Sequence, residues 1–289
     1  MKSINVTAKD GASIPAFFSD FDASAIKGVV IVSYGFGEYT GLYMEVADKF
    51  KQAGYAVILF EQRGHGAPPD GCKKWFGVIP GYQCFLDDIE SVTVAARQMA
   101  PDAPIILYGH SMGGNIVVNT LLRRQDPVYT CAVLESPWLG LYKGPGKLLT
   151  AIVRFLSRII PNFIIVNKLE VKDLSGDQSR AERYAPDPLY HNHISFRMYT
   201  GIDAACFNAM ANAALLPAPT FLAYATNDRI ISNQAIFEFA ADAGIMVTIK
   251  EYDCCHAIHN DVKREDFFRD MIAFLDTHCV PAPAAEPDA

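Results

Sequence analysis

Short apolar runs alternate with amphipathic segments along most of this chain. Continuous runs rich in β-branched residues are typical of strands buried on both faces of a sheet. Apolar residues at intervals of three and four, as in 43–53, are typical of helices packed on a core. The runs that predict buried strands cover 28–35, 55–64, 104–109, 131–137, 219–225 and 246–253, and the segments that predict helices cover 43–53, 86–99, 114–124, 233–243 and 262–275. Residues 4–18 predict two short strands joined by a turn at Asp10-Gly11. This alternation favours an α/β fold with a mostly parallel sheet and helices on both faces.

The alternation breaks between about Leu139 and Arg197, where we predict no strand. Within this interval, residues 147–166 carry apolar side chains at helical spacing and basic side chains on the other side. The apolar positions are Leu148, Leu149, Ile152, Phe155, Leu156, Ile159 and Ile160, and the basic ones are Lys147, Arg154 and Arg158. The interval follows the carboxyl end of a strand, the edge at which open α/β sheets bind ligands. We therefore expect an amphipathic helix in a cap over a site, with a helix packed on its own core as the alternative.

The chain is expected to divide into three parts on this basis. Residues 1–138 and 198–279 form the core, and residues 139–197 form the helical cap. Residues 280–289 are rich in proline and alanine and are expected to be a disordered tail. A length of 289 residues suits one large domain that carries such an insertion.

Charge and cysteine content narrow the range of partners and compartments. The 32 acidic and 25 basic residues give a formal net charge of -7, and no basic block is present to neutralise phosphates, which argues against a nucleic-acid partner. No window reaches the roughly 20 apolar residues that a bilayer span needs, and the first eleven residues contain no apolar run after Lys2. The seven cysteines form no C-x-x-C pair. We expect a cytoplasmic protein with reduced cysteines that serve mostly as small buried hydrophobes.

One serine lies in a pattern that carries chemistry. Residues Gly109 to Gly113 read G-x-S-x-G, after a predicted strand and before a predicted helix. In that context the pattern predicts a nucleophile elbow, a turn so sharp that the neighbours of the serine must lack bulk. Ser111 is therefore the candidate nucleophile, with a serine that merely caps a helix as the alternative.

A serine hydroxyl needs a base, and the base needs an acceptor that orients it. In elbow-type hydrolases the acid and then the histidine follow later in the chain. Asp228 comes directly after the predicted strand 219–225, and its alternative role is to cap the helix that begins near Asn233. His256 and His259 follow the last predicted strand. We favour His256 because it lies nearer the strand end, and we interpret His259 as a surface residue that begins the next helix.

The oxyanion of an acyl-transfer intermediate also needs donors. The backbone N–H of Met112 follows the candidate nucleophile at a helix N-terminus. The loop "YGFGE", residues 34–38, follows the strand 28–35 and offers the N–H of Phe36, with a plain glycine turn as the alternative. No cofactor or metal is predicted, because neither His256 with His259 nor the pair at 191 and 193 lies among carboxylates or cysteines at ligand spacing.

Six motifs in this order and spacing resemble the monoacylglycerol lipase and lysophospholipase branch of the α/β-hydrolase superfamily. They are "YGFGEYTGLY", "EQRGHGAPP", "GHSMGGNI", "ESPWL", "ATNDRII" and "CCHAIHND". The resemblance runs from about Gly28 to Leu275 and is interrupted by the cap. It implies the α/β-hydrolase fold, a triad of Ser111, Asp228 and His256, and oxyanion donors at Phe36 and Met112.

The same resemblance assigns supporting roles and shows one departure. His65 in "RGHG" belongs to a loop near the site, where a structural role is implied, and Glu38 matches an acidic residue that supports the oxyanion loop. This family usually begins the loop with His-Gly, whereas this chain has Tyr34-Gly35. The oxyanion donors are backbone groups and are therefore expected to be kept. The contribution of the family histidine side chain to loop position or head-group contact is not expected from Tyr34.

The expected activity is hydrolysis of carboxylic esters of single-chain lipids, monoacylglycerols or lysophospholipids, through an acyl-enzyme. The alternatives are a short-chain carboxylesterase, a proline-iminopeptidase-type peptidase that would use cap acids such as Glu170 and Glu182, and a non-catalytic binding protein. The apolar stripe of the cap fits three different contacts: its own core, a second copy, and transient contact with a membrane surface.

Overall fold

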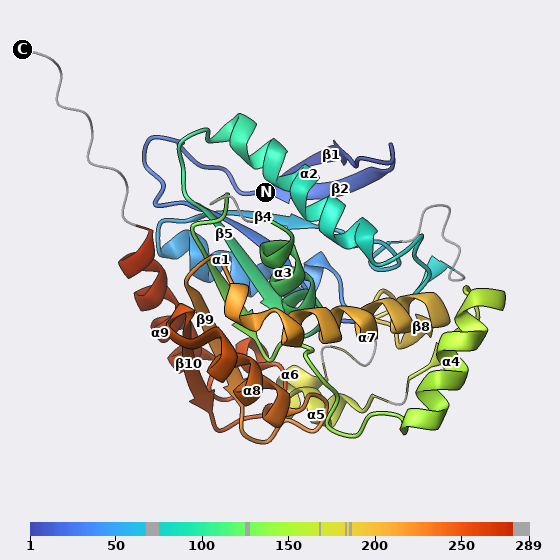
Figure 1. The fold of residues 1–289 in the computed structure, drawn as a ribbon. Coiled ribbons are helices and arrows are strands. Elements are labelled where there is room, and N and C mark those ends of the chain that lie inside the picture. Colours follow the sequence, from blue (N-terminus) through green and yellow to red (C-terminus); the bar gives the residue numbers. More distant parts are fainter. Residues whose placement is uncertain (68–74, 125–127, 168, 183, 185–186, 280–289) are drawn as a thin grey trace, which may run out of the picture.

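The centre of the structure is an eight-stranded sheet in the order β1-β2-β4-β3-β5-β6-β9-β10 (Figure 1). Its strands are β1 (Lys2–Thr7), β2 (Ser13–Phe18), β3 (Val29–Ser33), β4 (Ala56–Phe60), β5 (Ile105–His110), β6 (Cys131–Glu135), β9 (Thr220–Ala225) and β10 (Val247–Tyr252). The pairs that involve β1 or β2 are antiparallel, and the pairs from β4 to β10 are parallel. The predicted mostly parallel sheet is confirmed. The computed structural model describes residues 1–67, 75–124, 128–167, 169–182, 184 and 187–279.

Helices cover both faces of this sheet, and each face has its own hydrophobic core. Because side chains alternate along a strand, Ile31 of β3 lies in one core while Val30 and Val32 lie in the other. The first core includes α2 (Gln83–Met99), α3 (Met112–Arg123), α7 (Phe196–Ala211) and α8 (Asn233–Ala243), and the second includes α1 (Met44–Gln52) and α9 (Arg264–His278). Every residue of β3, β4 and β6 is buried, which explains why these runs are apolar without alternation.

The segment between β6 and α7 departs from the α/β pattern. It contains α4 (Lys147–Ile159), β7 (Ile164–Val166), α5 (Val171–Leu174), α6 (Gln178–Ala181) and β8 (His193–Ser195). The predicted amphipathic helix is present as α4. The expectation that this interval holds no strand is wrong, because β7 and β8 pair antiparallel as a separate two-stranded sheet. Strands of three residues are too short to show the alternation by which strands are recognised.

Helix α7 was not predicted from the pattern of apolar residues. Its 16 residues mix Gly201 and several small or polar residues into the helical period, which blurs the apolar face. The helix begins at a clear cap, because the Ser195 hydroxyl accepts the N–H of Met198 at 3.2 Å. A Cβ at Gly201 would lie 2.8 Å from Cβ of Tyr82, so glycine allows α7 to approach the start of α2 closely.

Three smaller expectations concern the ends of the chain and the turn between the first strands. Gly11 joins β1 to β2 with a positive φ of 82°, as the turn signal predicts. The tail expected at 280–289 lies outside the described residues. Within the part of the chain that the structure describes, no helix combines the length and the apolar character that crossing a bilayer requires.

Candidate active site

Ser111 lies at the sharp turn between β5 and α3, where the G-x-S-x-G pattern predicts an elbow. Its φ is 52°, in the left-handed region that serine seldom adopts. A Cβ at Gly109 would lie 2.5 Å from the carbonyl oxygen of Gly113, and a Cβ at Gly113 would lie 2.0 Å from that of Ser33. The glycines are therefore needed for strand and helix to approach this closely. A strained backbone at one serine is a feature that clusters at functional sites.

Asp228 and His256 meet at the carboxyl ends of the neighbouring strands β9 and β10. The Asp228 Oδ2 atom lies 2.6 Å from His256 Nδ1. The other oxygen, Oδ1, accepts the N–H groups of Ile230 and Ile231 at 2.8 and 2.9 Å. The carboxylate is thus fixed by the backbone and in turn orients the imidazole. Ser111 and His256 line the same cavity, so the structure brings all three predicted residues together.

The electrostatic surroundings of His256 favour its protonated form. Burial lowers the pKa of His256, but the Asp228 carboxylate raises it by charge and hydrogen bonding, with smaller contributions from Glu38 and Glu135, and the result is a pKa above the ordinary value of 6.5. A buried imidazole with a raised pKa is a stronger base toward a neighbouring hydroxyl.

The two predicted oxyanion donors come from the elbow and from the loop after β3. Met112 is the first residue of α3, so its N–H is one of the four that a helix leaves without an internal partner. Phe36 lines the cavity together with Ser111. The next residue, Gly37, has a φ of 78°, and a Cβ there would lie 1.9 Å from the carbonyl oxygen of His191. Since the His191 N–H also donates to the Gly37 carbonyl at 2.9 Å, the oxyanion loop is held by the segment before β8.

Glu38 fastens the same loop to the elbow. Its Oε2 accepts the Gly35 N–H at 2.8 Å and the Tyr43 hydroxyl at 2.6 Å, and it lies 3.2 Å from His110 Nδ1. Burial raises the pKa of Glu38, but His110, His259 and Tyr43 together lower it to about 2. The carboxylate is therefore charged at neutral pH and acts as an acceptor, which suits the predicted support role.

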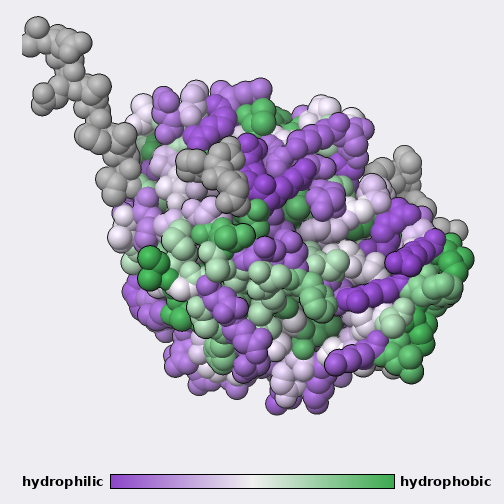
Figure 2. All heavy atoms as spheres, viewed as in Figure 1, coloured by the Kyte–Doolittle hydropathy of each residue, from purple (hydrophilic) through white to green (hydrophobic). Residues whose placement is uncertain are grey.

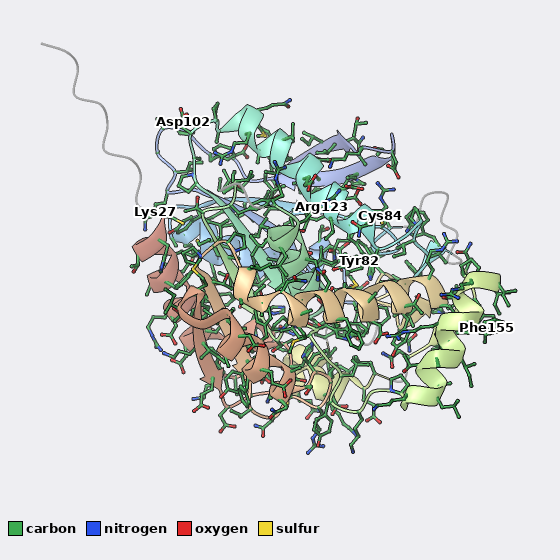
Figure 3. The ribbon with its side chains drawn as sticks, in the orientation of Figure 1. Lys27, Tyr82, Cys84, Asp102, Arg123 and Phe155 are labelled. Atoms are coloured by element: carbon green, nitrogen blue, oxygen red, sulfur yellow. The ribbon has the colours of Figure 1, made fainter. Side chains whose placement is uncertain are left out.

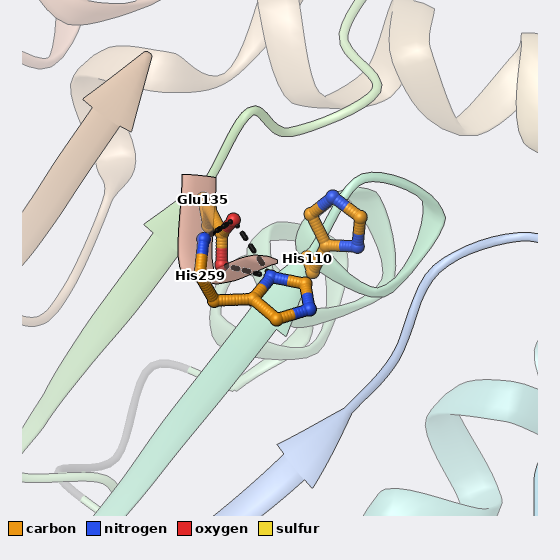
Figure 4. A group of neighbouring side chains, drawn as sticks. All are labelled: His110, Glu135 and His259. Atoms are coloured by element: carbon orange, nitrogen blue, oxygen red, sulfur yellow. Dashed lines mark hydrogen bonds and ion pairs between the residues drawn. The ribbon is translucent and has the colours of Figure 1, made fainter. Parts of the chain in front are cut away.

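His259 is buried, and the interpretation of it as a surface residue is wrong. Glu135 Oε1 accepts hydrogen bonds from the His259 backbone N–H and from its ring Nδ1–H, each at 2.9 Å (Figure 4). The Tyr108 hydroxyl donates to the other oxygen, Oε2. Burial raises the pKa of Glu135, but His259 and His110 lower it to about 2. Burial lowers the pKa of His259, and Glu135 raises it above its ordinary value. The ion pair anchors the loop that carries His256, which sequence reasoning missed although Glu135 ends the strand next to β5.

The side chains of His110, Glu135 and His259 could also be considered as metal ligands, because one ligand atom of each lies within 4.8 Å of the others. The expectation that the pair His256 and His259 does not lie among carboxylates at ligand spacing is wrong for His259, which lies beside Glu135. However, His259 Nδ1 already binds Glu135, and His110 Nδ1 lies 2.7 Å from the Tyr43 hydroxyl. The Nε2 atoms of His110 and His259 are buried and have no hydrogen-bond partner among the described residues, but both carboxylate oxygens of Glu135 already accept hydrogen bonds, from His259 and from Tyr108. The cluster therefore serves as a hydrogen-bonded support through Nδ1 and Glu135.

Two of the predicted supporting residues lie behind the cavity wall rather than in it. The Tyr34 hydroxyl accepts the Gln62 N–H at 2.6 Å and donates to Glu61 at 2.9 Å, which ties the loop after β3 to the loop after β4. His65 binds the Arg63 carbonyl through Nδ1 at 3.0 Å, and its ring packs edge-on against Phe36. Burial lowers the pKa of His65 to about 4, so this ring is neutral at pH 7.

Comparison with known proteins agrees with this geometry. The family described as "Serine aminopeptidase, S33", or Hydrolase_4, matches residues 24–263. The chain belongs to this family. The predicted resemblance to the monoacylglycerol lipase and lysophospholipase branch of the α/β-hydrolases is thereby confirmed.

Two relatives and two solved structures illustrate the similarity of this family member to known proteins. Phospholipase YtpA of Bacillus subtilis is 26% identical over 86% of this chain and 95% of its own length. The monoacylglycerol lipase of Mycolicibacterium smegmatis is 27% identical over 87% and 89%. The monoacylglycerol lipase of Paleococcus ferrophilus superposes with a TM-score of 0.81 at 26% identity, covering 91% of this chain and 99% of that one. A soluble variant of the Saccharomyces cerevisiae monoglyceride lipase shares the fold, with a TM-score of 0.83 at 24% identity over 96% and 94% of the two chains.

Proposed function

We propose that this protein is a serine hydrolase that cleaves carboxylic esters of single-chain lipids, monoacylglycerols or lysophospholipids. The observation that carries the proposal is the hydrogen bond between Asp228 and His256 beside a strained Ser111 in one cavity. The names of the relatives, a phospholipase and a monoacylglycerol lipase, support an ester of one acyl chain as substrate.

The reaction proceeds by acyl transfer to Ser111 and then to water. His256 takes the hydroxyl proton as the oxygen attacks the ester carbonyl, and the Asp228 carboxylate stabilises the imidazolium. The N–H groups of Phe36 and Met112 hold the oxyanion, and each such donor contributes about 3–4 kcal/mol to transition-state stabilisation. His256 then returns the proton to the leaving alcohol. In the second step, His256 takes a proton from water as the water attacks the acyl-enzyme, and the fatty acid is released as the proton returns to Ser111.

The lining of the cavity favours an acyl ester over a peptide with a free amine. Apolar side chains dominate it, namely those of Trp138, Leu141, Leu169, Leu174 and Ile230. Glu38 is the one acid among the described lining residues, and it is held by Gly35 and Tyr43. Glu170 and Glu182, the acids considered for a peptidase, are exposed and do not line this cavity.

We further propose that residues 139–197 act as a cap that contacts lipid surfaces transiently. The apolar stripe of α4 faces solvent: the side chains of Leu148, Phe155 and Ile159 are 76%, 60% and 62% exposed. Figure 2 shows a hydrophobic surface over α4, and Figure 3 shows Phe155 on its outer side. Such a stripe beside basic residues suits an interfacial helix. The alternative of a helix packed on its own core has little support, since Val153 is the one buried residue of α4.

A cytoplasmic location remains part of the proposal. The cysteines of the described residues are free thiols, as expected in a reducing compartment.

The proposal is tested by turnover of 1-monoacylglycerols and lysophosphatidylcholines with butanoyl to hexadecanoyl chains. The wild-type protein should hydrolyse them, and Ser111→Ala should fall to the small residual rate, roughly 10³ to 10⁴ above water, that binding and the oxyanion donors give alone. Ser157→Ala, on the exposed surface of α4, is the matched control and should keep full activity. Equal turnover by Ser111→Ala and the wild type would exclude the assignment.

A further inference from the structure

The last segment of the proposed cap, residues 191–195, lies against two loops of the core. The His191 N–H donates to the Gly37 carbonyl at 2.9 Å, and the Ser195 N–H donates to the Gly77 carbonyl at 3.0 Å. Both glycines have a positive φ, of 78° and 71°, and a Cβ at either would overlap a carbonyl oxygen of this segment. Glycine at these two positions therefore allows the segment to dock closely.

The side chain of His191 is held in one orientation and one protonation state. Its Nδ1 accepts the His193 backbone N–H at 3.2 Å, so the ring proton is on Nε2, which donates to the Gly64 carbonyl at 2.9 Å. Burial lowers the pKa of His191 to about 2, so the ring is neutral at pH 7. The ring also stacks on Phe76, with 4.5 Å between the ring centroids and 19° between the planes.

The ring of Phe36 packs against two histidine rings. It meets the His191 ring edge-on, with 5.9 Å between the centroids and 87° between the planes, and the His65 ring at 6.1 Å and 88°. The two histidine rings are themselves 5.0 Å apart. Edge-on packing of this kind favours one orientation of the Phe36 side chain.

The backbone on both sides of Phe36 is also held. Before it, the Gly35 N–H donates to Glu38 at 2.8 Å, and after it, the Gly37 carbonyl accepts the His191 N–H. His191 therefore contacts Phe36 twice, through its ring and through the next peptide group. These contacts restrict the direction of the Phe36 N–H, the proposed oxyanion donor.

We propose that His191 is a positioning residue of the reaction, which holds the Phe36 N–H in the direction of the oxyanion. This role rests on the proposed function and adds a residue of the cap to the machinery of the oxyanion site. His191 does not line the cavity at Ser111, so it acts through Phe36 rather than on the substrate. Oxyanion donors stabilise the transition state only when they are fixed in advance, which gives a neutral, buried and doubly hydrogen-bonded ring its function.

A pair of dodecyl ketones separates this role from general damage to the protein. A dodecyl trifluoromethyl ketone is attacked by the Ser111 oxygen at its carbonyl carbon. The hydroxyl proton passes to His256, and the electron pair of the carbonyl bond becomes an oxyanion that needs both donors. The corresponding methyl ketone binds without this adduct. Because unfolded protein lowers the active fraction for both ketones alike, the ratio of their inhibition constants reports on the oxyanion site.

The variant His191→Leu removes the ring and its hydrogen bonds. Relative to the methyl ketone, the trifluoromethyl ketone should bind at least about tenfold more weakly to this variant, because loss of one oxyanion donor costs about 10²–10³ in rate. On an ester substrate kcat should fall while KM stays unchanged. His191→Gln keeps an amide that can donate to the Gly64 carbonyl, and it should restore most of the ratio.

His278→Leu is the matched control. The His278 ring also stacks on a phenylalanine, Phe274, at 4.1 Å, and its Nδ1 binds the carbonyl of that residue at 2.8 Å, but it lies at the far end of α9. This variant should keep the wild-type ratio.

An unchanged ratio in His191→Leu, or equal weakening of the two ketones, would overturn the proposal while leaving the ester hydrolase intact. A His191→Gln that loses as much as His191→Leu, or an equal loss in His278→Leu, would overturn it too. If the wild type hydrolyses no ester and forms no adduct with the trifluoromethyl ketone, the proposed function fails and the role of His191 fails with it.

A double-mutant cycle tests whether His191 acts through the Phe36 ring. Phe36→Leu, His191→Leu and the double variant are compared by kcat on the same ester. If the two rings act through their mutual contact, the double variant should lose less than the product of the two single losses. Independent, multiplicative losses would contradict action through Phe36.

Discussion

At the scale of single residues, the site depends on carboxylates held in place by the backbone. Asp228 accepts two main-chain N–H groups before it meets His256, and Glu38 accepts one before it meets His110. Glu135 likewise accepts hydrogen bonds from the backbone N–H and the ring Nδ1–H of His259. Each acid therefore has a fixed direction, so that the imidazoles are oriented before substrate arrives.

The Asp228–His256 pair predicts the pH dependence of the reaction. Because His256 must be neutral to accept a proton, and because its pKa is raised, kcat/KM should fall as pH falls through a midpoint above 6.5. Asp228→Asn removes the charge that raises this pKa, so the midpoint should move to lower pH and the rate should drop by roughly 10⁴. Asp253→Asn, which alters an exposed acid on the same strand edge, is the control. A profile of Asp228→Asn that coincides with the wild type would contradict the pairing.

Tyr34 provides a prediction about stability. Tyr34→Phe leaves the buried Gln62 N–H without its acceptor and removes a donor to Glu61. The free energy of unfolding should fall by about 1–3 kcal/mol. Denaturant titration measures the difference, with Tyr142→Phe as a control in which the ring is half exposed. Equal stability of Tyr34→Phe and the wild type would show that the hydroxyl does not hold the loop.

At the scale of elements, the sequence predicted the helices and strands whose apolar residues follow a regular pattern of burial. Helix α8 was predicted with its observed bounds, and the buried runs of β3 and β4 left little choice, because strands covered on both faces must be apolar throughout. The sequence could not predict β7, β8 or α7, since their residues are set by neighbours distant in the chain, as the fit of Gly201 against Tyr82 shows. The elbow could be predicted from the five residues of the G-x-S-x-G pattern. The partner of His259 could not be predicted from the sequence, because Glu135 lies far from it in the chain and contacts it only after folding.

The elbow predicts a contrast between two glycines. Gly113→Ala would place its Cβ 2.0 Å from the Ser33 carbonyl oxygen, so strand β3 and helix α3 must separate. We expect a loss of at least about 2 kcal/mol of stability, as in overpacked cores. Gly81→Ala, where no atom lies within 4 Å of the added Cβ and the φ is not positive, should cost nothing measurable. Thermal unfolding of the two variants measures the difference in stability. If Gly113→Ala is as stable as the wild type, the packing at the elbow is looser than described.

At the scale of the whole molecule, Leu169 and Leu174 of the proposed cap line the cavity at Ser111, while the apolar residues of α4 face outward. The walls of the cavity at Ser111 come from the loop after β3, the elbow, and side chains that include Trp138, Leu174 and Ile230. We propose that the exposed stripe of α4 serves to bring a lipid substrate to this site.

Membrane contact through α4 is tested by flotation with vesicles of phosphatidylcholine and phosphatidylglycerol. The wild type should bind, and Leu148→Ser combined with Phe155→Ser should weaken binding at least about tenfold, since two large apolar side chains are removed from the contact. Leu215→Ser combined with Ile245→Ser removes two exposed apolar side chains elsewhere and should bind like the wild type. If both pairs behave alike, α4 is not the contact.

The most direct test of the central claim is to find the atom that carries the acyl group. Labelling the protein with a fluorophosphonate, followed by proteolysis and mass spectrometry, locates the covalent adduct. The account predicts a single adduct on Ser111, whose formation slows by orders of magnitude in His256→Ala. An adduct on any other residue, or labelling of Ser111→Ala at the wild-type rate, would contradict it.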